Sequence, residues 1–206
     1  DILGRSGLVA DAMGQAYEFR PQQMEMAEAV QKALRSKTHL VVEAGTGVGK
    51  SLAYLVPLIL WARDENCRVV VATYTKALQQ QIIRKDIPFL KTVLGDFRVA
   101  LCVGGENYLC LRRFDQLRMG DLYEQAEVEP LNRLFEWSTH TRTGLRSELA
   151  FEPPWGLWGK ACREADLCFG RDCANHKDCF YQKGKLIEQQ AQVLVANHHL
   201  FFADMA

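Results

Sequence analysis

A glycine-rich run in the first quarter of the chain has the residue types and spacing of a phosphate-binding loop. Residues 44–51 read Ala-Gly-Thr-Gly-Val-Gly-Lys-Ser, which fits GxxxxGK[ST] except that alanine stands at the first position. Such a loop binds phosphate through converging backbone N–H groups and a helix N-terminus that favours the anion. Lys50 would reach the β- and γ-phosphates, and the Ser51 hydroxyl would ligate Mg²⁺, so these two are the candidate catalytic residues. The predicted ATP site comprises Ala44, Gly45, Thr46, Gly47, Val48, Gly49, Lys50 and Ser51.

The segments on either side of this run match the setting that such a loop requires. His39–Glu43 is a short apolar run before the glycines, and Ser51–Ala62 is an apolar segment long enough for a helix. The predicted order is therefore strand, loop, helix. The alternative is a chance glycine-rich turn, and the relaxed pattern should arise by chance on the order of once per hundred chains of this size. The flanking segments favour phosphate binding.

A group of cysteines in the last quarter of the chain is a second candidate site. It comprises Cys168, Cys173 and Cys179, with Cys162 shortly before them and Cys110 well upstream. Structural zinc sites usually open with two cysteines only a few residues apart, and this run lacks such a pair. A four-cysteine iron-sulfur cluster accepts wider spacing. Spacing alone leaves three alternatives: an iron-sulfur cluster, a zinc site that recruits His176, and scattered free thiols. It also leaves the fourth ligand open between Cys162 and Cys110.

Length and composition limit the class of protein. The chain has 206 residues, 48% of them hydrophobic, so it can bury a core and should hold one or two domains. Its 25 basic and 25 acidic residues cancel, which excludes a global basic field and makes any nucleic-acid contact local. Seven cysteines without a signal peptide or a membrane-length apolar run indicate a reducing, cytoplasmic setting. Because it starts at Asp1 without Met and stops at Ala206, we expect a fragment of a longer protein.

Short β-branched runs alternate with helical sequence in the first half of the chain and return at its end. Buried strands are predicted at Arg68–Thr73, Arg98–Val103 and Gln192–Ala196, and a helix is predicted over roughly Lys76–Leu90, with Pro88 near its end. This alternation is typical of an α/β fold in which helices cover both faces of a parallel sheet.

The stretch from Gly104 to about Gln190 interrupts this alternation. It contains charged helical sequence, the segment Glu152–Lys160 with two prolines, two glycines and two tryptophans, and most of the cysteines. No further buried strand is predicted in it. We interpret this stretch as an insertion between two strands of one sheet.

Two groups of side chains in the insertion have competing interpretations. Arg112, Arg113 and Arg118 follow Cys110 and either meet nucleic-acid phosphates or form a solvated helical face. Trp155 and Trp158 either pack within the domain, which is the favoured interpretation, or offer a stacking platform for bases.

Several segments, taken in order, resemble the bacterial DinG and YoaA branch of the XPD-like iron-sulfur helicases. The resemblance covers nearly the whole chain. The segments that carry it are Arg20-Pro21-Gln22-Gln23 with Met26-Ala27, Val42 to Ser51, Thr73-Tyr74-Thr75 through Leu78-Gln79, Asn107-Tyr108-Leu109-Cys110, Cys168-Phe169-Gly170 through Cys173, Cys179-Phe180, and Asn197-His198-His199-Leu200 with Asp204. Their order and spacing together are far more specific than the phosphate loop alone.

The resemblance implies a fold and a cofactor. It implies a RecA-like α/β P-loop lobe with a parallel sheet, formed by residues 1–103 plus 191–206. A mainly helical iron-sulfur domain at residues 104–190 interrupts that lobe. It further implies a 4Fe-4S cluster, against zinc and against Cys162 as a ligand. The implied cluster ligands are Cys110, Cys168, Cys173 and Cys179.

The resemblance also implies an activity, namely ATP-dependent unwinding of DNA in the 5′ to 3′ direction during repair or replication restart. Gln23 would read the adenine, with Arg20 in the same nucleotide-binding motif. The segment Thr73–Gln79 would contact the backbone of single-stranded DNA. The implied cofactors are ATP with Mg²⁺ and the 4Fe-4S cluster. The implied partners are single-stranded and forked DNA, together with replication or repair proteins. The protein is expected to be a monomer without a membrane partner.

One part of the helicase machinery is missing from its expected place. Such helicases need an Asp-Glu pair after an apolar strand, to hold Mg²⁺ and polarise water, and a second lobe that supplies an arginine. The only Asp-Glu pair here, Asp64-Glu65, follows a predicted helix, so the acidic motif is expected beyond Ala206. Two other kinds of protein stay open: a non-enzymatic module whose cluster senses redox state or builds a partner-binding surface, and a P-loop enzyme with a structural zinc.

We predict that the isolated 206-residue chain binds nucleotide weakly and neither hydrolyses ATP nor unwinds DNA, because the acidic pair and the second lobe are absent from it. The measurement is ATP turnover by the purified chain with and without DNA, beside its Lys50→Ala variant. Both should show the same background rate. Turnover that DNA stimulates and that Lys50→Ala abolishes would contradict the prediction.

Overall fold

Three short parallel strands, two from the first half of the chain and one from its end, form one sheet in the order β1, β3, β2. In the computed structural model, which describes residues 2–120 and 123–203, the strands are β1 (Val69–Thr73), β2 (Val99–Leu101) and β3 (Val193–Asn197). β3 pairs with β1 in the register Val69 to Val193 and with β2 in the register Val99 to Val193. The three strand predictions in these regions and the parallel pairing are therefore confirmed.

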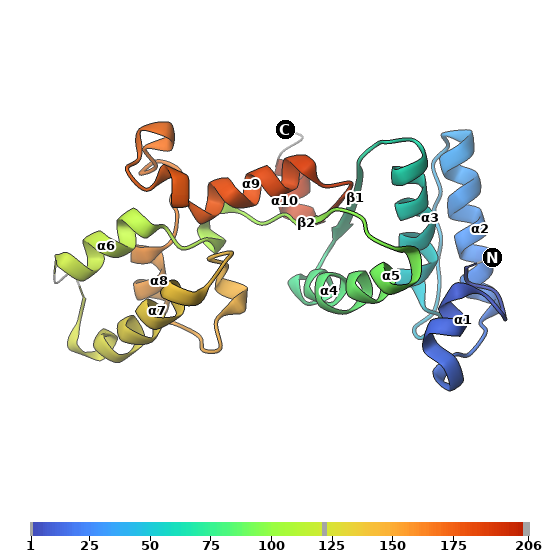
Figure 1. The fold of residues 1–206 in the computed structure, drawn as a ribbon, viewed down its shortest axis with the longest axis horizontal. Coiled ribbons are helices and arrows are strands. Elements are labelled where there is room, and N and C mark those ends of the chain that lie inside the picture. The colour runs from blue at the N-terminus through green and yellow to red at the C-terminus, as the bar shows by residue number, and fades with distance from the viewer. Residues whose placement is uncertain (1, 121–122, 204–206) are drawn as a thin grey trace. The chain divides into compact units, whose positions relative to one another are not determined.

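The chain divides into two compact units. Unit 1 comprises Asp1–Cys102 and Gln190–Ala206, and unit 2 comprises Val103–Gln189. Besides the sheet, unit 1 contains the helices α1 (Leu8–Met13), α2 (Pro21–Ser36), α3 (Lys50–Asp64), α4 (Lys76–Gln81), α5 (Ile87–Leu94) and α10 (His198–Ala203). Unit 2 is built mainly from the helices α6 (Leu111–Met119), α7 (Val128–His140), α8 (Trp155–Ala161) and α9 (Phe180–Gln190). Figure 1 labels the helices together with β1 and β2.

The core of unit 1 lies between the sheet and the helices that follow the glycine-rich loop. α2 and α3 pack side by side (Figure 1), and buried α3 side chains such as Leu55 and Ile59 share one hydrophobic cluster with Val71 of β1 and Val195 of β3. Burying such branched side chains contributes about 1.5–3 kcal/mol each. This packing fixes where α3 begins, and hence where the loop before it ends.

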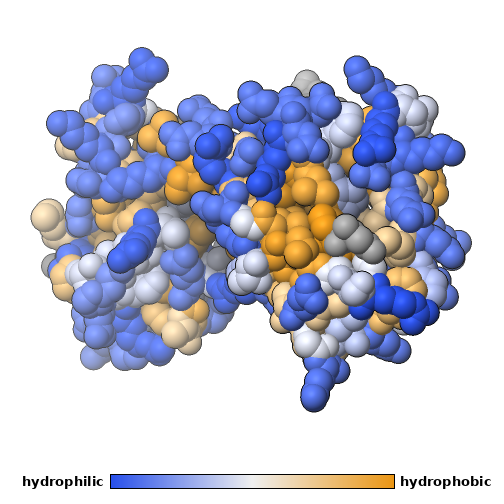
Figure 2. All heavy atoms as spheres, turned by 45° about the vertical axis from the view of Figure 1, so that its right-hand side comes forward, coloured by the Kyte–Doolittle hydropathy of each residue, from blue (hydrophilic) through white to orange (hydrophobic). Residues whose placement is uncertain are grey.

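The strand predicted at His39–Glu43 is wrong. These residues form no strand, and Val41 is 96% exposed. Figure 2 shows hydrophobic side chains gathered on one face of unit 1, and the exposed hydrophobic residues of this unit include Leu40, Val42 and Val70. A strand needs a neighbour to accept its backbone hydrogen bonds. Because the described sheet pairs only β1, β3 and β2, this apolar run has no such neighbour.

The helix predicted at Lys76–Leu90 continues farther, to Leu94, and is interrupted by a π-helical segment at Ile82–Asp86. The N–H of Ile87 donates to the carbonyl of Ile82, a wider turn than the α-helical one. Pro88 has no N–H to donate and would clash with the carbonyl four residues earlier, so a widened turn just before it relieves that conflict. The π segment separates α4 from α5.

Unit 2 has its own hydrophobic interior. Its buried residues include Phe114 of α6, Leu134 of α7 and Trp158 of α8. The indole N–H of Trp158 donates to the carbonyl of Glu106 at 2.8 Å, so the buried polar group of this ring is satisfied. Two isolated antiparallel bridges, Tyr108 with Leu145 and Leu109 with Cys162, tie the segment before α6 to distant parts of the unit.

Within residues 2–120 and 123–203, none of the helices is both long enough and apolar enough to cross a membrane.

Candidate functional site

The glycine-rich loop leads directly into the N-terminus of α3, as predicted. Gly47 and Gly49 adopt left-handed backbone angles, with φ of 81° and 80°, and α3 begins at Lys50. Side chains with a Cβ rarely adopt such angles, so the glycines permit the turn that points successive N–H groups toward one position. The loop is largely exposed. This arrangement fits a phosphate cradle at a helix N-terminus.

Lys50 folds back over the loop that precedes it. Its Nζ donates to the carbonyl oxygens of Ala44 at 2.7 Å and Gly45 at 2.9 Å. The ammonium group therefore lies over the loop, where it is exposed to a ligand. An ammonium has three donors and no acceptor, so phosphate oxygens can bind it in exchange for the carbonyls.

Arg20 and Gln23, the residues predicted to bind nucleotide upstream of the loop, lie beside its last glycine. Gln23 is only 5% exposed and donates from Nε2 to the carbonyl of Gly49 at 2.9 Å. Arg20 lies next to Gly49 as well and forms an ion pair with Glu18 at 3.1 Å. The amide of Gln23 has a second N–H and a carbonyl oxygen beyond this bond. The role of Gln23 in reading adenine stays a prediction.

Ser51, the predicted Mg²⁺ ligand, has an acidic neighbour that sequence reasoning missed. Asp86 lies near the side chains of Gln81 and Ser51. Burial raises the pKa of the Asp86 carboxyl above its ordinary value, although Gln81, Ser51 and the charge of Lys85 act in the opposite direction. The only sequence signal was an aspartate just before Ile-Pro in a helical segment, which does not indicate a contact with a distant loop.

The segment Thr73–Gln79, predicted to contact DNA, is divided between buried and exposed side chains. Gln79 is buried and donates to the carbonyls of Cys102 at 3.1 Å and Val195 at 3.2 Å, so its side chain links the residue after β2 to the middle of β3. Thr73 is buried and donates to the carbonyl of Thr75 at 3.1 Å. Tyr74, in contrast, is 77% exposed. Any DNA contact of this segment therefore depends on its exposed residues.

The four predicted cluster ligands belong to unit 2 but are not gathered. The seven cysteines, all within the described ranges, form no disulfide, and Cys110, Cys168, Cys173 and Cys179 are half-buried. Cys168, Cys173 and Cys179 each close a tight turn through their backbone N–H, to Ala165, Gly170 and His176 respectively. Within the described ranges, no group of three or more histidine, cysteine, aspartate or glutamate side chains is arranged to hold a metal ion. The four thiols thus suit an iron-sulfur cluster in number and chemistry, but they are too far apart in this structure to bind one metal site together.

One arginine links the segment of Cys168 to the start of α6. Arg112, two residues after Cys110, donates to the carbonyl of Leu167 at 2.6 Å and lies 4.2 Å from the centroid of the Phe169 ring. Both neighbours of Cys168 are therefore held by the helix that Cys110 precedes.

Cys162, the competing fourth ligand, is enclosed. Its side chain is buried, and its thiol donates to the carbonyl of Gly159 at 3.7 Å. Burial raises the pKa of the Cys162 thiol, against the opposing charge of Arg113. A metal ligand must be deprotonated, so this environment disfavours Cys162 as a ligand.

The structure also shows the surroundings of the remaining candidate DNA contacts, which are Arg113, Arg118, Trp155 and Trp158. Arg113 pairs with Glu164 at 3.2 Å, and Arg118 lies 3.7 Å from the centroid of the Phe135 ring, so both are held within unit 2. Trp158 is packed as predicted, whereas Trp155 is 76% exposed. The packing interpretation is therefore wrong for Trp155, because it stands on the outer face of α8.

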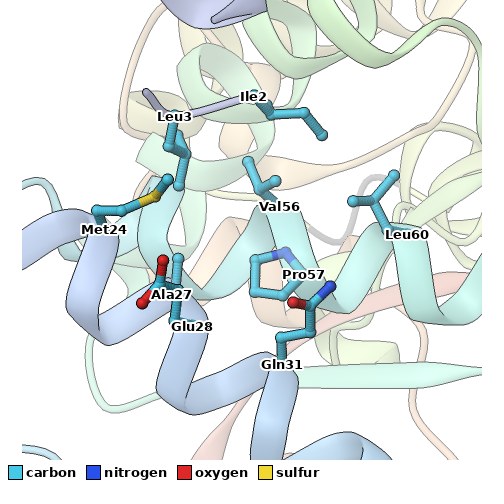
Figure 3. Close-up of a pocket in the computed structure, with 9 residues that line it drawn as sticks. All are labelled: Ile2, Leu3, Met24, Ala27, Glu28, Gln31, Val56, Pro57 and Leu60. Carbon is cyan, nitrogen blue, oxygen red and sulfur yellow. The ribbon is translucent and has the colours of Figure 1, made fainter. Parts of the chain in front are cut away.

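A pocket of about 290 Å³ lies between α2, α3 and the first residues of the chain (Figure 3). Met24, Val56 and Leu60 line it with apolar surface, and Glu28 and Gln31 add polar groups. The lining includes no residue of the phosphate loop, so this pocket is distinct from the predicted site.

The chain was compared with known proteins. A DEAD/DEAH box helicase family model matches residues 20–119. The ATP-dependent DNA helicase YoaA of Haemophilus influenzae is 38% identical over 195 residues, which cover 91% of this chain and 30% of the relative. YoaA of Escherichia coli is 38% identical over 209 residues, covering 100% of this chain and 32% of the relative. A Bacillus subtilis protein named 3'-5' exonuclease DinG is 32% identical over 191 residues, covering 91% of this chain and 20% of the relative. The chain thus spans about a third of the two YoaA proteins.

We predict that Gly49→Ala destabilises unit 1, because a Cβ there would overlap Nε2 of Gln23 and the backbone is left-handed. The free energy of unfolding should fall by about 1–3 kcal/mol in urea titrations. Gly45→Ala is the matched control, because its Cβ meets nothing and its φ lies outside the left-handed region. That variant should change stability by less than about 0.5 kcal/mol. Equal stability of the two variants would contradict this account of the loop.

Proposed function

This chain belongs to the DinG/YoaA-type family of ATP-dependent DNA helicases, and on that premise we propose that it forms the nucleotide-binding part of a protein that unwinds DNA from 5′ to 3′ at the expense of ATP. One observation carries the proposal: the loop has two left-handed glycines, leads directly into α3 and carries Lys50 over its carbonyls. The loop conformation suits the binding of an anion at the N-terminus of α3.

ATP binds with its phosphates at the loop. The N–H groups of the loop and of the first turn of α3 donate to phosphate oxygens, and Lys50 exchanges its bonds with the loop carbonyls for the β- and γ-phosphates. Ser51 supplies an oxygen ligand for Mg²⁺, which neutralises phosphate charge when bound. Gln23 and Arg20, next to Gly49, complete the nucleotide site on the adenine side.

Hydrolysis requires further parts of the family's machinery. A P-loop ATPase needs a carboxylate that holds Mg²⁺ and a group that orients the attacking water, and the Asp64-Glu65 pair lies at the end of α3 rather than after a strand. The curated YoaA relatives are about three times as long as this chain. The complete activity therefore belongs to a protein of that length, acting in repair or replication restart.

Single-stranded DNA is bound by exposed aromatic and basic side chains. Tyr74 in unit 1 and Trp155 in unit 2 are the supporting observations, since both rings are mostly exposed. The guanidinium of Arg146 lies 5.1 Å from the Trp155 ring centroid and pairs with the carboxylate of Glu152, so the ring rather than the charge is what DNA would meet. Base stacking on such rings contributes about 1–3 kcal/mol per base.

The insertion holds a 4Fe-4S cluster through Cys110, Cys168, Cys173 and Cys179. The support is the free, half-buried state of these thiols, the link from Arg112 to both neighbours of Cys168, and the enclosed position of Cys162. The bound cluster would cross-link the turns to the start of α6.

The proposed helicase function is tested in a protein that continues this chain to the length of its YoaA relatives. DNA-stimulated ATPase and unwinding of a fork with a 5′ single strand are measured for the parent and for Lys50→Ala. The variant should lose roughly a hundredfold or more, because the charge on the transferred phosphoryl group is no longer stabilised. Lys32→Ala, on the exposed face of α2, is the control and should keep both activities. Redox-dependent partner binding without ATPase would instead support the non-enzymatic alternative.

The ligand set is tested in the same protein by iron content and visible absorption. Cys110→Ser should abolish iron incorporation, because a four-cysteine cluster loses one ligand. Cys162→Ser should retain iron, because that thiol is enclosed and bonded to Gly159. The opposite result for the two variants would overturn the assignment, and a colourless protein containing zinc would exclude the cluster.

A further inference from the structure

Two residues leave the sheet of unit 1 side by side, at the carboxyl ends of β1 and β3. Thr73, the last residue of β1, pairs with Asn197, the last residue of β3. Tyr74 and His198 are therefore the first residues beyond two adjacent parallel strands. Ligands of open α/β sheets bind outside the carboxyl ends of the strands. Side chains that meet at this edge of the sheet are thus placed where a ligand can reach them.

The aromatic rings of these two segments form a row, which comprises Tyr74, His198 and Phe202 with Phe201 at its side. The ring centroids of Tyr74 and His198 lie 6.2 Å apart, and those of His198 and Phe202 lie 6.3 Å apart. Phe201 packs edge-on against Phe202, with 5.3 Å between the ring centroids. These distances are typical of favourable aromatic pairs. Because every one of these pairs is tilted by at least 58°, the rings do not cover one another's faces.

The two ends of this aromatic row are open to solvent. Tyr74 is 77% exposed and Phe202 is 61% exposed, whereas His198 between them is half-buried. Single exposed apolar side chains are common on protein surfaces, but apolar surface gathered in one place marks a site of interaction. The contacts with His198 hold together two exposed rings from segments that are far apart in the sequence.

The chemistry of the row suits the unpaired bases of a nucleic-acid strand. Bases stack on aromatic side chains whatever their sequence, because every base has a flat π-face. Lys76, two residues after Tyr74, is exposed and offers a positive charge for the phosphate backbone. Rings rather than charges dominate the row, so it favours a contact with base faces over a contact with phosphates alone.

We propose that the aromatic row is a stacking platform for unpaired bases of single-stranded DNA, in which one base lies on Tyr74 and another on Phe202 while His198 holds the two rings in place. This inference rests on the proposed binding of single-stranded DNA. It goes beyond that proposal because it adds His198 and Phe202 from the end of the chain. It also assigns base stacking to a region from which a backbone contact alone is expected.

The test compares a strand that has bases with one that lacks them, in a protein that continues this chain to the length of its YoaA relatives. Fluorescence anisotropy gives the affinity for oligothymidine and for an abasic strand of equal length and charge, without nucleotide and at one salt concentration. Tyr74→Ala and Phe202→Ala should each weaken binding of oligothymidine about 5- to 150-fold. Binding of the abasic strand should stay within about twofold of the parent, because it has no bases to stack. A general loss of structure would weaken both complexes alike.

Two control variants keep the comparison specific. Tyr74→Phe retains the ring and loses only the hydroxyl, so it should bind both strands as the parent does. Met13→Ala removes an exposed apolar side chain at the end of α1, a helix that packs against α5, and should likewise leave both affinities unchanged.

The outcomes distinguish this platform from the wider proposal. If Tyr74→Ala and Phe202→Ala bind oligothymidine as tightly as the parent, the platform is overturned while DNA binding stands. A changed oligomeric state with unchanged DNA binding also overturns it, because the row would then be a protein interface. A parent that binds neither strand overturns the proposed DNA binding as well.

Discussion

The pairing of β3 with both of its neighbours is the interaction on which the structure of unit 1 depends. β3 lies at the centre of the sheet, and Val193 and Val195 are fully buried in the core. The strand comes after the whole of unit 2, so the connection between β2 and β3 is the crossover that parallel strands require. The entropy cost of closing a loop grows only slowly with its length, and unit 2 has a buried interior of its own. An insertion of this size is therefore compatible with a stable sheet.

The same core positions the chemistry of the phosphate loop. Leu55 and Ile59 anchor α3 in the core, so the helix N-terminus is fixed and the loop before it must turn sharply at Gly47 and Gly49. The π segment is anchored in that core by Ile82. Ser51 and Asp86 approach each other because two helical segments, separated in sequence by β1, pack on one cluster. Packing therefore sets where these segments lie, and the glycines supply the local backbone angles of the loop.

Local patterns predicted the parts of the fold that local forces determine. β-Branched runs gave the correct position of β1 and β3, and the glycine spacing gave the loop and the start of α3. The strand at His39–Glu43 was wrong because pairing is non-local, and an apolar run without a neighbour stays unpaired. The proximity of Asp86 to Ser51 could not be predicted either, because Pro88 marks an irregular turn but not the tertiary packing that brings this turn against α3. The exposure of Trp155 could not be predicted either, because it depends on which face of α8 packs against the rest of unit 2.

The two proposed sites differ in what organises them. The phosphate loop is organised by the chain alone, since glycine angles and a helix N-terminus need no ligand to form. The cysteine site is not organised by the chain alone. Bringing four thiols together gives little free energy without a metal, and metal binding requires the thiols to lose their protons. Some local order forms without metal. Each of three cysteines closes a tight turn, and Arg112 contacts both neighbours of Cys168. The remaining approach of the thiols in the proposed cluster then has to be driven by the free energy of metal binding.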